Sequence, residues 1–267
     1  MSGLTIGTRG ETQIHETALV DPAAQLGAGV TVGPWAMIGP RVVVGDGTQI
    51  GPRVLVERDT TLGEDCNISN GAVLGTDPQD LKFQGEETTL EIGARTVIRE
   101  FATLNRGTSA AGVTVVGSDC LLMAYTHVAH DCEVGNHVVL ANSVNMAGHV
   151  VIEDCVIVGG LTPIHQFVRI GAHAFVGGGS RVPQDVPPYC SAAGNPLKLY
   201  GLNSVGLDRR GFSEDVRKGL KQTYRILFQS SENVSRALER AEKEVPAIPE
   251  VRHLLEFIRG SERGITL

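Results

Sequence analysis

Long hydrophobic runs and aromatic residues are scarce in this 267-residue chain, and each absence excludes a class of protein. No stretch approaches the ~20 apolar residues of a membrane-spanning helix, so we expect no transmembrane segment. Residues 1–16 lack the apolar core of a secretory signal, which predicts a cytoplasmic protein. Aromatic residues make up only 4% of the chain, but apolar residues reach 42%, which argues against disorder.

Cysteines are few and follow no metal-binding or disulfide pattern. The five of them include no CxxC pair: they are Cys66, Cys120, Cys132, Cys155 and Cys190. An odd number at these spacings fits neither a disulfide framework nor a zinc knuckle. We therefore interpret them as small apolar side chains in a reducing compartment.

Excess positive charge is absent as well, since the net charge is −7. Residues 1–194 carry 10 Lys and Arg against 20 Asp and Glu, whereas residues 195–267 carry 13 against 10. An acidic body argues against a nucleic acid partner, because binding to phosphate backbones needs a basic surface. Residues 195–227, with 7 basic and 3 acidic residues, could instead bind an acidic partner.

A period of six dominates the first two thirds of the chain. Between Ile14 and Val182, 26 of the 29 positions spaced by six hold Ile, Val, Leu or Met, and the exceptions are Asp80, Glu86 and Ala110. Neither a helix nor an alternating strand has this period. A short strand and a tight turn per six residues predict a triangular coil of 18 residues, and stacked coils form a β-helix. The glycines beside many aliphatic residues suit corners that need positive φ or close packing.

The repeat predicts a mostly β domain over residues 1–194. Residues 76–91 and 107–115 break the aliphatic pattern without changing its register, so we expect them to project as loops. The pattern stops after Val182, and the DVPPY segment at 185–189 is expected to prevent further strand pairing.

A small all-α domain is predicted over residues 195–267. We expect helices at 213–228, 231–244 and 249–259, the first of them capped by Ser213. This domain would cover the last open edge of the coil.

Five of the eight histidines fall between residues 127 and 165. Because residues 18 apart stack in adjacent coils, the period predicts three neighbouring pairs: His130 with Gly148, Asp131 with His149, and His127 with Asn145. This polar strip could be a ladder at a subunit interface, a metal site or an acid–base site. Asp131 beside His130 favours the acid–base reading, and the Gly148 N–H would suit an oxyanion.

The six-residue pattern resembles the hexapeptide-repeat acyltransferases, a resemblance that implies a left-handed parallel β-helix. Six segments narrow it to the UDP-N-acetylglucosamine O-acyltransferase family of lipid A synthesis: 77–86 (DPQDLKFQGE), 98–108 (IREFATLNRGT), 126–150 (THVAHDCEVGNHVVLANSVNMAGHV), 164–178 (IHQFVRIGAHAFVGG), 184–189 (QDVPPY) and 206–213 (GLDRRGFS). Members of that family transfer a 3-hydroxyacyl chain from acyl carrier protein to the glucosamine 3-hydroxyl of UDP-N-acetylglucosamine, the first step of lipid A biosynthesis.

The resemblance also implies roles for individual residues. His130 would be the general base, Asp131 would orient it, and the Gly148 N–H would stabilise the oxyanion. The implied substrate-binding residues are Asp80, Lys82, His127, His149, His165, Gln166, Asn203, Arg209 and Arg210. The resemblance further implies a homotrimer in the cytoplasm of a Gram-negative-type bacterium. No metal would be needed, and no cofactor beyond the phosphopantetheine of the carrier protein.

Two positions bear on specificity within this family. Asn105 stands where some relatives have histidine. Gly178 occupies the position that forms the floor of the acyl groove in this family, and because glycine has no side chain we expect the groove to accept a long acyl chain. Three alternatives stay open: an N-acyltransferase acting on a 3-amino nucleotide sugar, a zinc carbonic anhydrase on the same prism, and a non-enzymatic solenoid scaffold.

Overall fold

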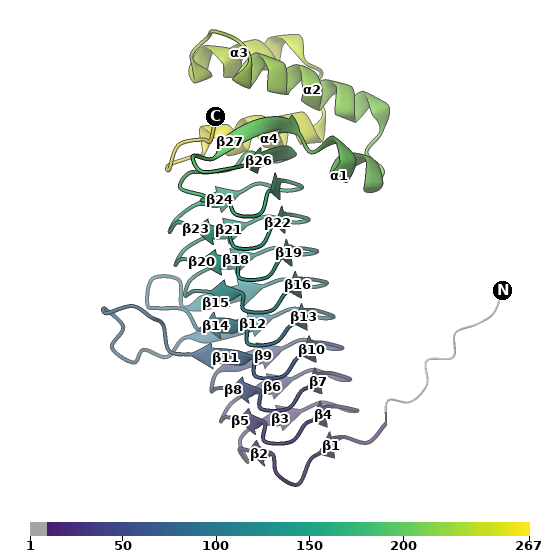
Figure 1. The fold of residues 1–267 in the computed structure, drawn as a ribbon, viewed down its shortest axis with the longest axis vertical. Coiled ribbons are helices and arrows are strands. Elements are labelled where there is room, and N and C mark those ends of the chain that lie inside the picture. The colour runs from purple at the N-terminus through teal and green to yellow at the C-terminus, as the bar shows by residue number, and fades with distance from the viewer. Residues whose placement is uncertain (1–9) are drawn as a thin grey trace, which may run out of the picture. The chain divides into compact units, whose positions relative to one another are not determined.

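The computed structural model describes residues 10–267, and these form two compact units, one ending at Cys132 and the other spanning Glu133–Leu267. The fold is a left-handed parallel β-helix with a C-terminal helical part, as the repeat and the resemblance predict (Figure 1). No helix among the described residues is long and apolar enough to span a bilayer. The expected domain division after residue 194 stays a prediction.

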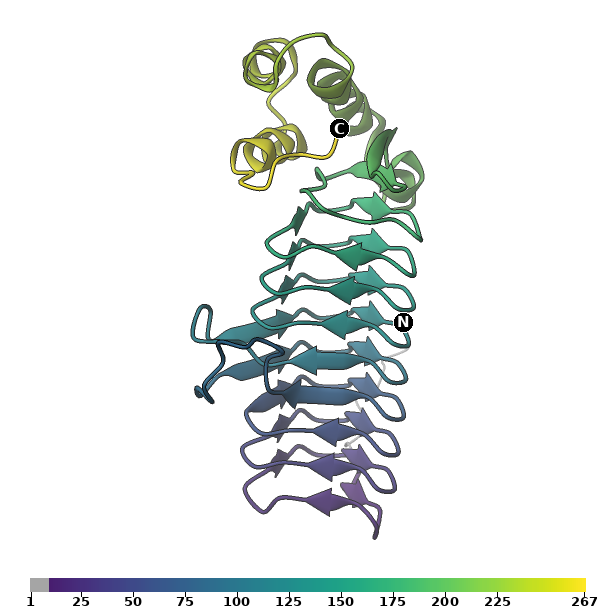
Figure 2. The same ribbon diagram turned by 60° about the vertical axis from the view of Figure 1, so that its left-hand side comes forward.

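The first unit consists of very short strands that pair in parallel in three sheets (Figures 1 and 2). Its first sheet contains β1 (Gln13–Ile14), β4 (Thr31–Val32), β7 (Gln49–Ile50), β10 (Asn67–Ile68), β13 (Val97–Ile98) and β16 (Leu121–Leu122). Its second contains β2 (Leu19–Val20), β5 (Met37–Ile38), β8 (Leu55–Val56), β11 (Val73–Thr76), β14 (Thr103–Asn105) and β17 (His127–Val128). Its third contains β3 (Gln25–Leu26), β6 (Val43–Val44), β9 (Thr60–Leu62), β12 (Thr89–Ile92) and β15 (Val113–Val116).

Two loops interrupt this unit without disturbing its pairing. Asn67 pairs with Gln49 on one side and with Val97 on the other, and Val97 pairs with Leu121. The first loop therefore adds twelve residues to the 18-residue coil and the second adds six. Both are whole repeats, so the aliphatic register survives.

The loops are shorter than the sequence predicts. Strand β11 extends to Thr76 and β12 begins at Thr89, so the first loop spans 77–88 rather than 76–91. Strand β15 begins at Val113, which shortens the second loop to 106–112. The loop-flanking strands are longer than the others because their extra backbone groups pair with one another across adjacent coils.

Two columns of side chains, rather than one, fill the coil of the first unit. The predicted aliphatic column is buried from Val32 onward, with Leu62, Ile68 and Leu74 at 1% exposure or less, whereas Ile14 in the first coil is 49% exposed. A second buried position lies two residues earlier in each repeat and holds small side chains, such as Ala72 and Val54. Three cysteines occupy this second column: Cys66, Cys120 and Cys132. Their burial confirms that they act as small apolar residues in the core.

The corners of the coil take a left-handed backbone at a position that sequence reasoning did not identify. Eighteen non-glycine residues within 10–267 have φ between 54° and 66°, including Trp35 and Asp131. The glycines that follow many of the aliphatic residues serve close approach instead. A Cβ on Gly63, for example, would lie 2.5 Å from the backbone nitrogen of Ala94.

The second unit continues the same architecture. Its strands are β18 (Glu133–Val134), β19 (Val139–Leu140), β20 (Asn145–Met146), β21 (Val151–Ile152), β22 (Ile157–Val158), β23 (Pro163–Ile164), β24 (Arg169–Ile170), β25 (Phe175–Val176), β26 (Cys190–Ala193) and β27 (Lys198–Leu202). Strand β27 pairs antiparallel with β26, whereas the pairs β18–β21 and β22–β25 are parallel.

Strand pairing continues beyond Val182, so the expected stop at DVPPY was wrong. Val186 forms a parallel bridge with Ile170, and β26 pairs in parallel with β25. Pro188 sits in the turn between them and packs beside Gly171. Proline is tolerated there because a corner residue does not need to donate a ladder hydrogen bond.

Four helices follow in the described chain: α1 (Ser204–Arg209), α2 (Glu214–Phe228), α3 (Val234–Glu244) and α4 (Pro249–Arg259). Ser213 caps α2 as predicted, by accepting a hydrogen bond from the Val216 N–H. Helix α3 begins later than expected, because Asn233 caps it at the Arg236 N–H. Helix α1 was not predicted.

The helices follow the last strands of the second unit, and in Figure 1 α2 lies above β26 and β27 whereas α4 lies at the level of β27. Tyr189, at the end of the coil, belongs to the same buried cluster as Leu220 of α2 and Leu254 of α4. Its hydroxyl bonds to His253 Nδ1 at 2.9 Å, and His253 Nε2 lies 2.9 Å from Glu153 of the coil. The helical part therefore covers the end of the coil, as the sequence predicts.

Two backbone features lead to a stability prediction: the close approach at glycines such as Gly63, and the left-handed corners that non-glycine residues occupy. Gly63→Ala should destabilise the protein by about 1–3 kcal/mol, because its Cβ would overlap backbone atoms of the next coil. His137→Gly, at an exposed corner with φ of 56°, should cost nothing or stabilise slightly, because glycine relieves the left-handed strain. Urea unfolding of both variants measures the difference. Equal stability of Gly63→Ala and the wild type would contradict the close-approach role.

Candidate active site

The turn after β17 brings His130 and Asp131 together in the first unit. His130 Nδ1 lies 2.8 Å from Asp131 Oδ2, and the side chains are 12% and 0% exposed, respectively. Asp131 occupies a corner with φ of 57°, a conformation in which aspartate is tolerated better than most residues. The predicted pair is therefore a real contact, with the carboxylate inside and the imidazole nearer the surface.

The second loop holds the Asp131 carboxylate in place. Thr108 donates twice, from its N–H to Oδ1 at 2.8 Å and from its hydroxyl to Oδ2 at 2.6 Å. The N–H of Ala111 adds a longer bond of 3.3 Å, and the Asp131 N–H donates to the Thr114 hydroxyl at 2.9 Å. Sequence reasoning identified this loop but none of these three residues, because a threonine in a polar loop carries no distinguishing pattern.

This network determines the role that His130 can play. Asp131 accepts from Thr108, so the hydrogen bond to His130 is satisfied when Nδ1 carries the proton and donates it. We assign this tautomer from the network. In a neutral imidazole of this tautomer, Nε2 has the lone pair and can accept a proton from a hydroxyl.

His127 lies on the outward face of β17, three residues before His130. Its Nδ1 is 2.7 Å from the Thr103 hydroxyl. Burial lowers the pKa of His127 below its ordinary value, a hydrogen bond with the Thr103 backbone opposes this effect, and the charge of nearby His130 adds to the lowering. A neutral His127 is suited to polar contacts with a sugar rather than to ion pairing.

The first loop carries Asp80 and Lys82 away from the coil. It projects from the end of β11, a neighbour of β14 in the sheet that contains β17 (Figures 1 and 2). Asp80 Oδ1 accepts from the Lys82 N–H at 3.0 Å, and its C=O accepts from the Phe83 N–H, which makes a tight turn. Lys82 is exposed at the tip of this turn.

The second unit contains the remaining predicted residues of the histidine-rich stretch. The His149 ring stacks on Phe167 with centroids 4.5 Å apart, and the C=O of buried Gly148 accepts from the Phe167 N–H at 3.2 Å. His165 Nδ1 accepts a hydrogen bond of 2.9 Å from Arg263, a residue that sequence reasoning missed. Gln166 is exposed beside it.

The three C-terminal candidates, Asn203, Arg209 and Arg210, lie at the two ends of helix α1, which was not predicted. Asn203 caps α1, since its Oδ1 accepts from the Gly206 N–H at 3.1 Å and its Nδ2 donates to the His173 C=O at 3.0 Å. Arg209 ends α1 and Arg210 follows it, both exposed. The sequence predicted no helix in this stretch, but residues up to Arg209 form one.

Gly178 lies in the exposed turn after β25. A Cβ at this position would lie 3.2 Å from the C=O of Gly160, so a side chain here would have to pass closely over the neighbouring coil. Because glycine has no side chain, nothing at this position projects over the neighbouring coil.

Comparison with known proteins gives matches over nearly the whole chain. A family model described as Udp N-acetylglucosamine O-acyltransferase, Domain 2, matches residues 185–266, and a model of six bacterial transferase hexapeptide repeats matches 41–76 and 114–148. The chain is 51% identical over 255 residues to the acyl-[acyl-carrier-protein]–UDP-N-acetylglucosamine O-acyltransferase of Myxococcus xanthus, covering 95% of this chain and 99% of the relative. The protein of the same name from Paracidovorax citrulli is 56% identical over 259 residues, with the same coverage.

Two solved structures are similar in fold as well as in sequence. LpxA from Acinetobacter baumannii superposes with a TM-score of 0.93 at 43% identity, covering 95% of this chain and 99% of that one. LpxA from Bacteroides fragilis, described as a UDP-N-acetylglucosamine acyltransferase, gives a TM-score of 0.94 at the same identity and coverage.

Proposed function

The chain belongs to the UDP-N-acetylglucosamine O-acyltransferase family, and on that premise we propose that it transfers a 3-hydroxyacyl chain from acyl carrier protein to the glucosamine 3-hydroxyl of UDP-N-acetylglucosamine. This reaction would be the first step of lipid A synthesis in the cytoplasm of a Gram-negative-type bacterium. The observation that carries the proposal is the His130–Asp131 hydrogen bond, with the carboxylate buried and held by Thr108.

In the proposed reaction, His130 Nε2 takes the proton of the sugar 3-hydroxyl while the hydroxyl oxygen attacks the thioester carbonyl. Asp131 orients the imidazole through Nδ1 and stabilises the imidazolium. The Gly148 N–H is the proposed donor to the oxyanion. Collapse of the tetrahedral intermediate forms the ester and breaks the C–S bond. The imidazolium then returns its proton to the departing phosphopantetheine thiolate, so no resident cofactor or metal is needed.

Substrate contacts in this proposal follow the resemblance. Asp80 and Lys82 on the first loop would bind the nucleotide sugar with His127 and His149, and an exposed ammonium suits a phosphate. The pair His165 and Gln166 would line the sugar or pantetheine groove. Asn203, Arg209 and Arg210 would reach the nucleotide or phosphopantetheine.

Acyl carrier protein would dock on the basic part of the second unit. Among the seven basic residues of 195–227, Arg217 pairs with Asp208 and Lys218 with Glu214. A hollow of about 340 Å³ borders this region, and it includes apolar Leu202 and Leu207 in its lining. The lining of this hollow carries three basic residues, Arg217, Lys218 and Lys221, against one acidic residue, Glu214. This excess of positive charge is complementary to an acidic partner, because charge steers association.

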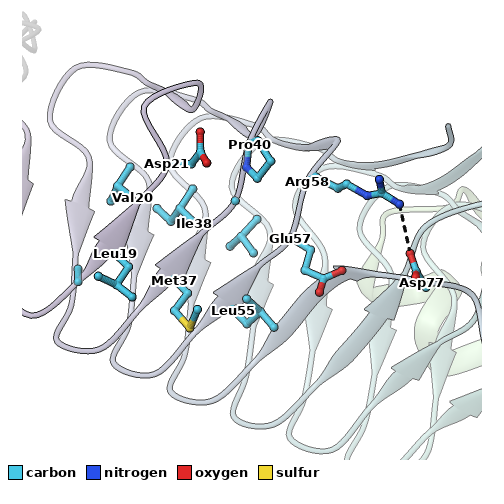
Figure 3. A pocket seen from close by; sticks show the side chains of 13 residues that line it. Leu19, Val20, Asp21, Met37, Ile38, Pro40, Leu55, Glu57, Arg58 and Asp77 are labelled. Carbon is cyan, nitrogen blue, oxygen red and sulfur yellow. Dashed lines mark ion pairs between the residues drawn. The ribbon is translucent and has the colours of Figure 1, made fainter. Parts of the chain in front are cut away.

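A homotrimer is part of the proposal, and one face of the first unit supports a contact between copies. Leu19 and Met37 are 64% and 49% exposed, and with Leu55 they line a groove of about 690 Å³ (Figure 3). These residues pair in register along the sheet that also contains His127. Apolar side chains gathered on one face favour burial by a partner. A second copy placed there would also border the His127 side of the site.

Replacing Met37 by glutamate tests the contact between copies. A charge on this face should dissociate the assembly, because burying an unpaired carboxylate is costly. Light scattering after gel filtration should give the mass of three 28.3-kDa chains for the wild type and a smaller mass for Met37→Glu. Val43→Glu, at a 38% exposed apolar position on the third sheet, is the matched control and should stay trimeric. A monomeric wild type would contradict the proposal.

The transfer reaction itself is tested with purified substrates. The wild type should acylate UDP-N-acetylglucosamine from 3-hydroxyacyl carrier proteins, and His130→Ala should be slower by ~10²–10⁴, the usual contribution of a general base. His137→Ala, an exposed corner histidine, should be as active as the wild type. Mass spectrometry measures the product, and a series of donor lengths tests the long chain expected from Gly178.

The same assay separates the alternatives. Mild alkali releases the acyl group from an ester but not from an amide, so an alkali-stable product formed on a 3-amino sugar would favour the N-acyltransferase. Loss of activity with a chelator, restored by zinc, would favour a metal enzyme. Full activity of His130→Ala would overturn the assigned base.

A further inference from the structure

Arg106 has no surface exposed to solvent and is the largest fully buried side chain within residues 10–267. It directly follows β14, at the point where the second loop begins, and the proposed reaction gives it no role. A fully buried arginine is unusual because charged side chains rarely lose all contact with water unless they are paired.

The guanidinium of Arg106 binds the start of the first loop. It donates hydrogen bonds to the C=O of Gly75 and to the carboxylate of Asp77, and its Nη1 lies 3.5 Å from Glu57 Oε2. Neighbouring Asn105 adds a bond from Nδ2 to the C=O of Asp77 at 3.0 Å.

The backbone around Arg106 binds both ends of the same loop. The Arg106 N–H donates to the C=O of Thr76 at 3.0 Å, and the Gly107 N–H donates to the C=O of Thr89 at 3.2 Å. Thr76 and Thr89 flank the loop 77–88 on its two sides. One short segment therefore sets where the loop leaves the coil and where it returns.

The rest of the loop is held by contacts of a different kind. Asp80 caps the Lys82 N–H, and Glu86 accepts from the Gln84 N–H at 3.0 Å. These bonds shape the turn locally without setting its direction, whereas a hydrogen bond between Glu86 and Ser109 links the loop to its neighbour. The direction of the loop therefore depends on the contacts at its base, together with this one link to the second loop.

The energetic balance also indicates a geometric role for Arg106. Burying a guanidinium carries a large desolvation cost, and well-packed apolar residues usually stabilise a core at least as well. What an arginine supplies is a planar fork of donors that aligns its acceptors in fixed directions. Here those acceptors are the Gly75 carbonyl and the Asp77 carboxylate at the loop base.

We propose that Arg106 is a positioning residue that aims loop 77–88, and with it Lys82 and Asp80, at the nucleotide sugar. This inference rests on the proposed function, because it is that function which assigns Lys82 and Asp80 to the sugar nucleotide. Arg106 would act only through the loop and would not touch substrate.

Arg106→Met tests the inference against Arg58→Met. Arg58 also pairs with Asp77, at 3.7 Å, but from the exposed side (Figure 3). We expect Arg106→Met to raise the KM for UDP-N-acetylglucosamine at least tenfold and to leave the KM for acyl carrier protein within twofold. Trypsin should cut the folded variant after Lys82 at least ten times faster than the wild type. Arg58→Met should change each quantity less than twofold.

The possible outcomes are distinguishable. Arg106→Met could fold and lose thermal stability, yet match Arg58→Met in both KM values and in the rate of tryptic cleavage. That result would show a merely structural role and overturn the inference. If Arg106→Met does not fold, Asp77→Asn weakens the same contact from a side chain that is 60% exposed, and it should give the same pattern with smaller changes. A wild type that transfers no acyl group would overturn the proposed function as well. An unchanged KM for UDP-N-acetylglucosamine in Lys82→Ala would overturn this inference and the assignment of Lys82 to the nucleotide sugar, but not the acyl transfer reaction.

Discussion

Every feature of this fold depends on parallel strands stacked in register, so that each residue lies beside its counterpart one coil away. That stacking admits only side chains that fit the narrow interior, which explains the columns of aliphatic and small residues and the scarcity of aromatics. Both insertions keep the aliphatic period in phase along the chain, because the spacing of Asn67, Val97 and Leu121 shows that each adds a whole multiple of six residues.

The same constraint explains where the chemistry lies. Side chains along the strands are divided between the core and the flat faces, so groups that must meet a substrate gather at corners and on loops. The backbone of Asp131 has a left-handed conformation at its corner, and the second loop projects from the preceding coil beside it. The Asp131 carboxylate can therefore accept from the Thr108 hydroxyl on that loop. The His130 imidazole is then oriented by a carboxylate that the loop itself holds.

The sequence predicts much of this because its strongest signals are periodic. The aliphatic column, both loops, the cap at Ser213 and the His130–Asp131 contact were all confirmed. The second inward column was missed because Ala, Val, Thr and Cys alternate there without a common type. DVPPY was misjudged because proline at a corner interrupts no ladder, and α1 is too short to show helical periodicity. Thr108 and Arg106 act through contacts distant in sequence, which no local pattern reveals.

The central claim is that the buried Asp131 carboxylate makes His130 a base, and the most direct test is the rate of acyl transfer by Asp131→Asn. Asparagine keeps the size of the side chain and can still bond to Thr108, but it removes the charge that orients the imidazole and stabilises the imidazolium. With folding verified by thermal unfolding, the account predicts a transfer rate at least ~100-fold below that of the wild type. A rate within about threefold of the wild type, on the other hand, would contradict it.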